Sequence, residues 1–118
     1  MTDIRSELKE RLNMDLDRAL KELSLPQAAF ERVARVSLLS TASILDALDT
    51  AITAGDTDAI SRGAHELKGV FMNLRFSSLA EPAQQMEVLI KAGASMKDVR
   101  RQLEVLRAQY AILKEVFR

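Results

Sequence analysis

Residues 60–74, which read ISRGAHELKGVFMNL, decide the interpretation of this chain. Apolar residues recur there at alternating spacings of four and three, which is the period of one face of an α-helix. The positions concerned are Ile60, Ala64, Leu67, Phe71 and Leu74. The stretch therefore predicts an amphipathic helix that buries this stripe.

The rest of the chain also has the composition of a helical protein. Its 118 residues include four glycines and two prolines, and no run alternates polar and apolar residues over strand length. The predicted fold class is all-α, in a single domain of residues 1–118. Because short connections favour antiparallel neighbours, we expect an up-down antiparallel four-helix bundle over residues 24–118. An additional N-terminal helix over residues 1–23 should cap it, giving five helices.

Residues that satisfy free backbone groups predict where these helices begin and end. The predicted starts are Asp3, Ser24 with Gln27, Asp56, Ser78 with Glu81, and Ser95 with Asp98, and the predicted ends are Leu23, Gly55, Leu74 and Gly93. Pro26 and Pro82 should lie in first turns. The predicted buried face of residues 24–55 comprises Phe30, Val33, Ser37, Ile44, Leu48 and Ala51.

Charge and cysteine content exclude several function classes. Seventeen basic residues balance seventeen acidic ones, so we expect no nucleic-acid partner and no attraction to a membrane surface. One histidine and no cysteine cannot form a standard zinc site, so no metal is expected. The charged N-terminus and the lack of a long apolar run predict neither a signal peptide nor a membrane span, and a cytoplasmic location is expected.

The only histidine, His65, lies off the buried stripe of its helix. At about 100° per residue it is about 140° from the stripe centre, and Arg62, Gly69 and Met72 share its outer face. We therefore expect an exposed imidazole in the middle of the helix. A lone histidine is more often an ordinary surface or core residue, so its neighbours must carry any functional interpretation.

Two neighbours of His65 suggest an anion-transfer site. Gly69 lies one turn later in a helix interior, where glycine costs about 1 kcal/mol relative to alanine. Its missing side chain would leave room beside the imidazole for a phosphoryl group and an approaching partner, although it could equally allow close helix packing. Lys68 borders the same opening, and its ammonium could reach phosphate oxygens on the ring.

The segment His65-Glu66-Leu67-Lys68-Gly69 resembles the His-x-Leu-Lys-Gly signature of histidine-phosphotransfer (HPt) domains of two-component phosphorelays. Further along, the family has a Leu-Ala pair and, one helix later, an apolar-Glu pair. The matching positions in this chain are Leu79-Ala80, Ala83 and Met86-Glu87. The resemblance covers residues 24–118 and is strongest over residues 60–90. One departure is Arg75, which occupies a turn position where the family usually has glycine.

The resemblance implies both a mechanism and a site. His65 would accept a phosphoryl group at Nε2 and relay it to or from an aspartate of a response-regulator receiver domain, and Glu87 would bond or orient the imidazole. The chain would be a phosphoryl carrier without kinase activity or a cofactor, because it has no glycine-rich phosphate loop. The receiver would supply Mg²⁺, and a hybrid sensor histidine kinase would be the donor.

A partner must dock over the histidine face. Met72 and Phe76 are predicted to supply apolar contact, and Arg62 and Arg75 polar contact, with exposed residues of the preceding helix completing the patch. We expect a monomer, because a closed bundle buries its own apolar stripes. Two alternatives remain open at this stage: a helical adaptor in which His65 is incidental, and an inactive relative that binds a receiver without phosphoryl transfer.

Overall fold

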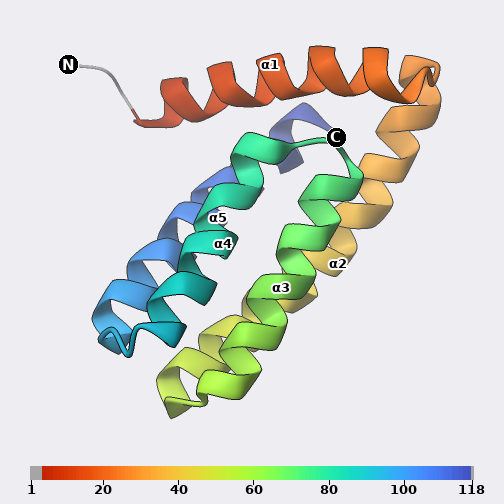
Figure 1. The fold of residues 1–118 in the computed structure, drawn as a ribbon. Coiled ribbons are helices and arrows are strands. Elements are labelled where there is room, and N and C mark those ends of the chain that lie inside the picture. The colour runs from red at the N-terminus through yellow and green to blue at the C-terminus, as the bar shows by residue number, and fades with distance from the viewer. Residues whose placement is uncertain (1–3, 118) are drawn as a thin grey trace.

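The computed structural model describes residues 4–117, which form five helices and no strand (Figure 1). The helices are α1 (Ile4–Leu23), α2 (Gln27–Ala54), α3 (Thr57–Asn73), α4 (Ser77–Lys91) and α5 (Met96–Val116). The predicted start of the first helix at Asp3 lies outside the described residues. The all-α prediction is confirmed.

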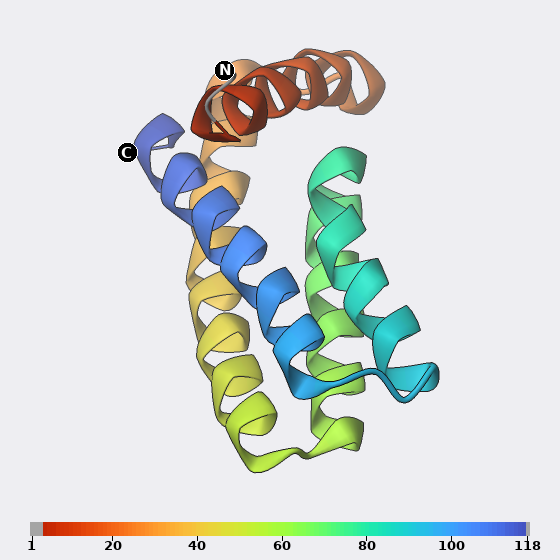
Figure 2. The same ribbon diagram turned by 90° about the vertical axis from the view of Figure 1, so that its left-hand side faces the viewer.

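Helices α2 to α5 run up and down beside one another, and α1 lies across one end of them (Figures 1 and 2). That end is where α2 and α4 begin and where α3 and α5 finish (Figure 2). The most extensive helix contact is between α3 and α4, while α1 contacts α4 and α5. The predicted four-helix bundle with an added N-terminal helix is thus confirmed.

The stripe of residues 60–74 lies in the core, where each of its five side chains is at most 5% exposed. Three phenylalanine rings join different helices at the end nearest α1. The Phe76 ring lies 5.8 Å from that of Phe30 and 6.4 Å from that of Phe117. Aromatic contacts of this kind add to the free energy of burying the rings.

The buried face of α2 differs from the predicted one at Val33, which is 49% exposed. Ala34 and Thr41 are buried instead. Because α2 packs against both α3 and α5, its small residues are enclosed where the helices approach closely. A prediction based on apolar size therefore chose Val33 over its smaller neighbour.

Several predicted helix ends are confirmed. Gly55 and Gly93 adopt the left-handed conformation after α2 and α4, with φ of 68° and 71°. The Asp56 carboxylate accepts a hydrogen bond from the Ala59 backbone N–H at 3.1 Å, and the Ser95 hydroxyl accepts one from Asp98 N–H at 3.4 Å. These local signals work because donor and acceptor lie within one helical turn.

The predicted caps at Ser24 and Ser78 are wrong. Helix α2 begins directly after Pro26 without a side-chain cap. Helix α4 begins at Ser77, before the predicted cap, so Pro82 lies in its second turn rather than its first. Ser78 itself bonds to Asp15 of α1. A local sequence motif cannot predict a capping group that comes from a distant helix.

Helix α2 is, among the described residues, the only helix long and apolar enough to cross a membrane by length and composition, which the sequence analysis did not predict. A core helix of a bundle passes the same test. Here α2 buries eight residues and contacts α3 and α5, as a bundle helix does.

Ion pairs join α2 to α5. Arg100 Nη1 donates a hydrogen bond to Asp49 Oδ1 at 2.8 Å, and Arg107 Nη2 donates one to Asp49 Oδ2 at 3.2 Å. The hydrogen bond from Arg100, helped by the positive charges of Arg100 and Arg107, lowers the pKa of the Asp49 carboxyl, while partial burial opposes this effect.

Asp49→Asn should therefore destabilise the bundle in a pH-dependent way. A carboxyl whose pKa is lowered by folding stabilises the folded state above its unfolded pKa of about 3.9, and loses this effect as pH falls through the folded pKa. Urea unfolding should show a stability difference from wild type that is constant between about pH 5 and 7. The difference should shrink below about pH 4, and a difference of the same size at pH 2 would contradict the account.

Candidate functional site

His65 lies at the middle of α3 with its side chain 74% exposed, as its helical phase predicted. Its Nδ1 atom is 3.7 Å from Oε1 of Glu87 on α4. The other ring nitrogen, Nε2, lies beyond Cε1 and makes no hydrogen bond or ion pair with any group among residues 4–117. The packing of α4 on α3 thus gives the two nitrogens different surroundings.

Glu87 and Lys68 form the more enclosed part of this cluster. The Glu87 side chain is 18% exposed and that of Lys68 is 29% exposed, with 3.5 Å between Lys68 Nζ and Glu87 Oε1. Glu87 Oε1 is itself buried, and although Lys68 lies at ion-pair distance, no group among residues 4–117 donates a hydrogen bond to it. A buried acceptor without a donor is costly, so this atom is ready to accept a proton-bearing group.

The two glycines of α3 have opposite surroundings. A Cβ atom built on Gly63 would lie 2.8 Å from Cδ2 of the buried Leu48, so Gly63 lets α2 approach α3. A Cβ atom on Gly69 would meet nothing within 4 Å. Close helix packing therefore explains Gly63 and does not explain Gly69.

The four predicted partner-binding residues divide into two groups. Arg62 and Arg75 are exposed, and Met72 is 46% exposed. Phe76 is fully buried in the phenylalanine cluster, so it cannot provide the exposed apolar contact predicted for it. The sequence placed it in a loop, but its ring closes the end of the core.

Arg75 adopts the left-handed conformation that the family usually assigns to glycine, with φ of 63°. Such a conformation costs a non-glycine residue about 1–2 kcal/mol. The arginine makes contacts that glycine cannot make: its Nη1 donates a hydrogen bond to the Met72 carbonyl at 3.2 Å, and its Nε lies 3.6 Å from Oε2 of Glu22. Arginine therefore occupies a backbone conformation that glycine adopts without strain, and its side chain contacts both α3 and α1.

The sequence analysis did not single out Val36 and Leu39 on α2. They are 66% and 75% exposed and lie three residues apart, on neighbouring turns of the same helix. Leu39 lines a groove between α2 and α3 together with Gly63 and Glu66, the residue next to His65. The sequence gives two adjacent leucines, Leu38 and Leu39, and only the orientation of the helix decides which of them is exposed.

No group of three or more residues that could hold a metal ion is found within residues 4–117. The cluster on α3 and α4 instead joins an exposed imidazole to a lysine, an open glycine position and a nearby carboxylate. In an antiparallel four-helix bundle, this arrangement is typical of histidine-phosphotransfer proteins.

Comparison with known protein families agrees with this class. The chain matches the family described as Hpt domain over residues 32–116, which is more than two thirds of its length. The chain therefore belongs to the Hpt domain family. Hpt domains are phosphoryl carriers rather than kinases, and they act with receiver and kinase domains in phosphorelays. No curated protein and no solved structure matches the chain.

Alanine at the two glycines of α3 should have opposite effects on stability. Gly69→Ala should raise the free energy of unfolding by about 0.5–1 kcal/mol, because alanine favours the helix and its Cβ meets open space. Gly63→Ala forces buried Leu48 to move, and overpacking of this kind costs about 1–3 kcal/mol. Urea denaturation of both variants checks this, and equal stability would contradict the assignment of Gly63 to packing.

Proposed function

We propose that this chain accepts a phosphoryl group on Nε2 of His65 and exchanges it with an aspartate of a response-regulator receiver domain. The observation that carries the proposal is the exposed imidazole at mid-helix whose Nδ1 faces a buried carboxylate oxygen. Membership of the Hpt domain family supports the same reaction class.

Glu87 would direct which ring nitrogen reacts. A proton on Nδ1 would give Glu87 Oε1 a hydrogen bond in addition to its ion pair with Lys68, once the present 3.7 Å separation shortens to about 2.9 Å. The lone pair then remains on Nε2, which has no bonding partner among residues 4–117. Holding an imidazole in one tautomer through a carboxylate is a recurrent way of preparing it for reaction.

The transfer step can be written with His65 as nucleophile. The Nε2 lone pair attacks the phosphorus of the receiver's aspartyl phosphate, an N–P bond forms, and the P–O bond to the aspartate breaks to release its carboxylate. The product carries positive charge on the ring while Nδ1 stays protonated, and Glu87 would stabilise that charge. The reverse step returns the phosphoryl group to an aspartate.

Lys68 and Gly69 would accommodate the phosphoryl group. In the unmodified protein Lys68 lies beside Glu87, and its flexible ammonium could turn to phosphate oxygens on the neighbouring imidazole. Gly69 leaves the space one turn from His65 open, and a Cβ atom there would meet no side chain of residues 4–117. On this interpretation, glycine at position 69 destabilises the helix but leaves room for the partner to reach His65.

The docking surface would extend from His65 over α3 and α2. The Gly63–Leu48 contact sets the register of the two antiparallel helices. Leu39 lies nine residues before Leu48, and Met72 nine residues after Gly63, so the two lie at the same level. Val36, Leu39 and Met72 would form the apolar centre of this surface, with Arg62 and Arg75 at its rim.

The remaining features follow the behaviour of Hpt domains. We propose a cytoplasmic monomer that works as one unit over residues 1–118, and that has no kinase activity, cofactor, nucleic-acid partner or membrane attachment of its own. A hybrid sensor histidine kinase would donate the phosphoryl group through its receiver, and the receiver would supply Mg²⁺.

Phosphoryl transfer from a receiver charged with acetyl phosphate tests the reaction directly. Wild type should acquire acid-labile, base-stable label, and His65→Gln should acquire none. The variant should fold normally because the His65 side chain is largely exposed. Undiminished labelling of His65→Gln would contradict the proposal. Receiver binding without any label on wild type would instead identify an inactive relative.

Leu39→Asp tests the docking surface. A charge at this exposed position should leave the fold intact but weaken receiver binding about tenfold, the effect expected at the centre of an interface. Val88→Asp is the matched control, because Val88 is 49% exposed in a groove formed with Gln102 of α5. Isothermal titration with the receiver should separate the two variants, and equal effects would contradict the surface.

A further inference from the structure

Helix α1 lies outside the segment that matches the Hpt domain family, yet it is attached to the bundle by specific contacts. Leu8, Leu12 and Ala19 bury its apolar face. At its beginning, Arg5 pairs with Glu115 of α5. Lys9 pairs with the same glutamate. Polar contacts farther along α1 are made with the first turn of α4 and with the turn between α3 and α4.

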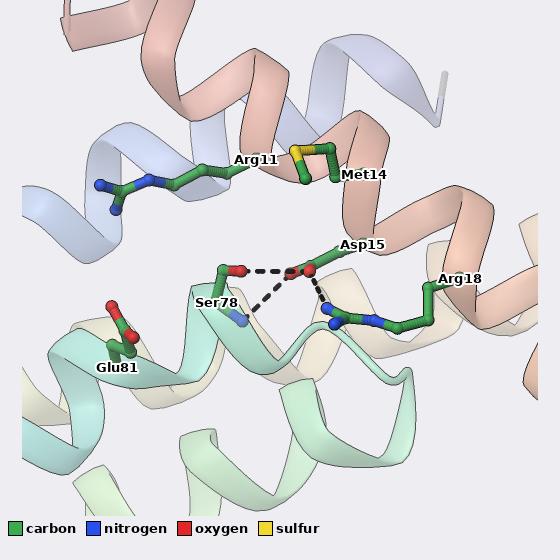
Figure 3. A pocket seen from close by; sticks show the side chains of 6 residues that line it. All are labelled: Arg11, Met14, Asp15, Arg18, Ser78 and Glu81. Carbon is green, nitrogen blue, oxygen red and sulfur yellow. Dashed lines mark hydrogen bonds and ion pairs between the residues drawn. The ribbon is translucent and has the colours of Figure 1, made fainter.

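Asp15 makes the contact with α4 and is the only charged residue among residues 4–117 that is buried, at 1% exposure. Figure 3 shows its carboxylate directed at Ser78 across the junction of α1 and α4. The Ser78 backbone N–H donates to Asp15 Oδ2, and the Ser78 hydroxyl donates to Oδ1, both at 3.1 Å. Arg18 of α1 pairs with the same carboxylate at 2.5 Å.

The Asp15 carboxylate caps the N-terminus of α4, although it belongs to α1. Phe76, the residue before α4, provides no side-chain cap, so Asp15 satisfies a backbone N–H that α4 would otherwise leave free. Its negative charge also lies where the helix dipole favours an anion. The start of α4 is therefore held in place by α1.

A second contact holds the turn that joins α3 to α4. Glu22, near the end of α1, lies 3.6 Å from Arg75, which keeps its left-handed conformation in that turn and bonds to the last residues of α3. The two contacts hold both sides of the connection between the helices that carry His65 and Glu87.

We propose that Asp15 is a positioning residue for the His65 site, acting through the placement of α4. Glu87 lies nine residues beyond Ser78 on one continuous helix, a separation of about 13.5 Å along the axis. A displacement at the start of α4 therefore changes the distance between Glu87 Oε1 and His65 Nδ1. The effect on phosphoryl transfer rests on the proposed function, whereas the effect on the imidazole does not.

The test uses the full chain labelled with ¹⁵N in its single histidine, so that the shifts of Nδ1 and Nε2 report the tautomer of His65. Glu87→Gln should change these shifts and serves as the reference. Asp15→Asn should change them in the same direction, and Asp17→Asn should not, because Asp17 is an exposed carboxylate on the same helix. Circular dichroism should show the same helix content in all variants.

Wild-type shifts in a folded Asp15→Asn variant, together with altered shifts in Glu87→Gln, would overturn the proposal. If Asp15→Asn does not fold, Ser78→Ala decides, since it removes only the hydroxyl bond. A smaller change in the same direction supports the proposal, and unchanged shifts overturn it.

Phosphoryl transfer provides the second measurement. Asp15→Asn should slow transfer from a phosphorylated receiver about tenfold, because small misplacement of a reacting group is costly. Failure of wild type to accept label would reject the proposed function and leave the tautomer result to judge the positioning role. Wild-type transfer rates in Asp15→Asn would overturn that role.

Discussion

The packing of α4 against α3 is the constraint on which the rest of the structure depends. It brings Glu87 to within 3.7 Å of the His65 imidazole and 3.5 Å of the Lys68 ammonium. On a helix without a neighbouring carboxylate, both nitrogens of an exposed histidine would face water and no protein group would select the tautomer. Glu87 places a carboxylate beside Nδ1 alone, and the proposed phosphoryl acceptor depends on this difference between the surroundings of the two nitrogens. In the proposed mechanism, Asp15 would maintain this contact through α4 and Gly69 would leave space beside the imidazole.

The two glycines of α3 have different surroundings, one at a helix contact and one beside the site. Gly63 faces α2 and allows close packing against Leu48, whereas Gly69 faces open space beside His65. The same residue type thus permits close packing at one position and, in the proposed site, would permit access at the other. Arg75 represents a third case, because its strained conformation persists where its side chain contacts Met72 and Glu22. That contact links the turn after α3 to α1.

The sequence predicted the parts of the structure that depend on local spacing. The stripe of residues 60–74, the exposed position of His65 and the caps at Asp56 and Ser95 all involve residues within a few turns of one another. Features that depend on distant partners were missed. Asp15 caps α4 from 63 residues away, and Phe76 is buried by rings from α2 and the C-terminus. The exposure of Leu39 could also not be predicted without knowing which face of α2 packs on the bundle. The face predicted from apolar side-chain size was wrong at Val33, which is exposed.

The position of the phosphoryl group on the imidazole tests the central claim most directly. Phosphorylated protein labelled with ¹⁵N in its single histidine can be examined by ³¹P–¹⁵N correlation spectroscopy. The account predicts one phosphohistidine, with phosphorus coupled to Nε2 of His65, because Nδ1 faces Glu87. Coupling to Nδ1, or phosphate bound to any other residue, would contradict it.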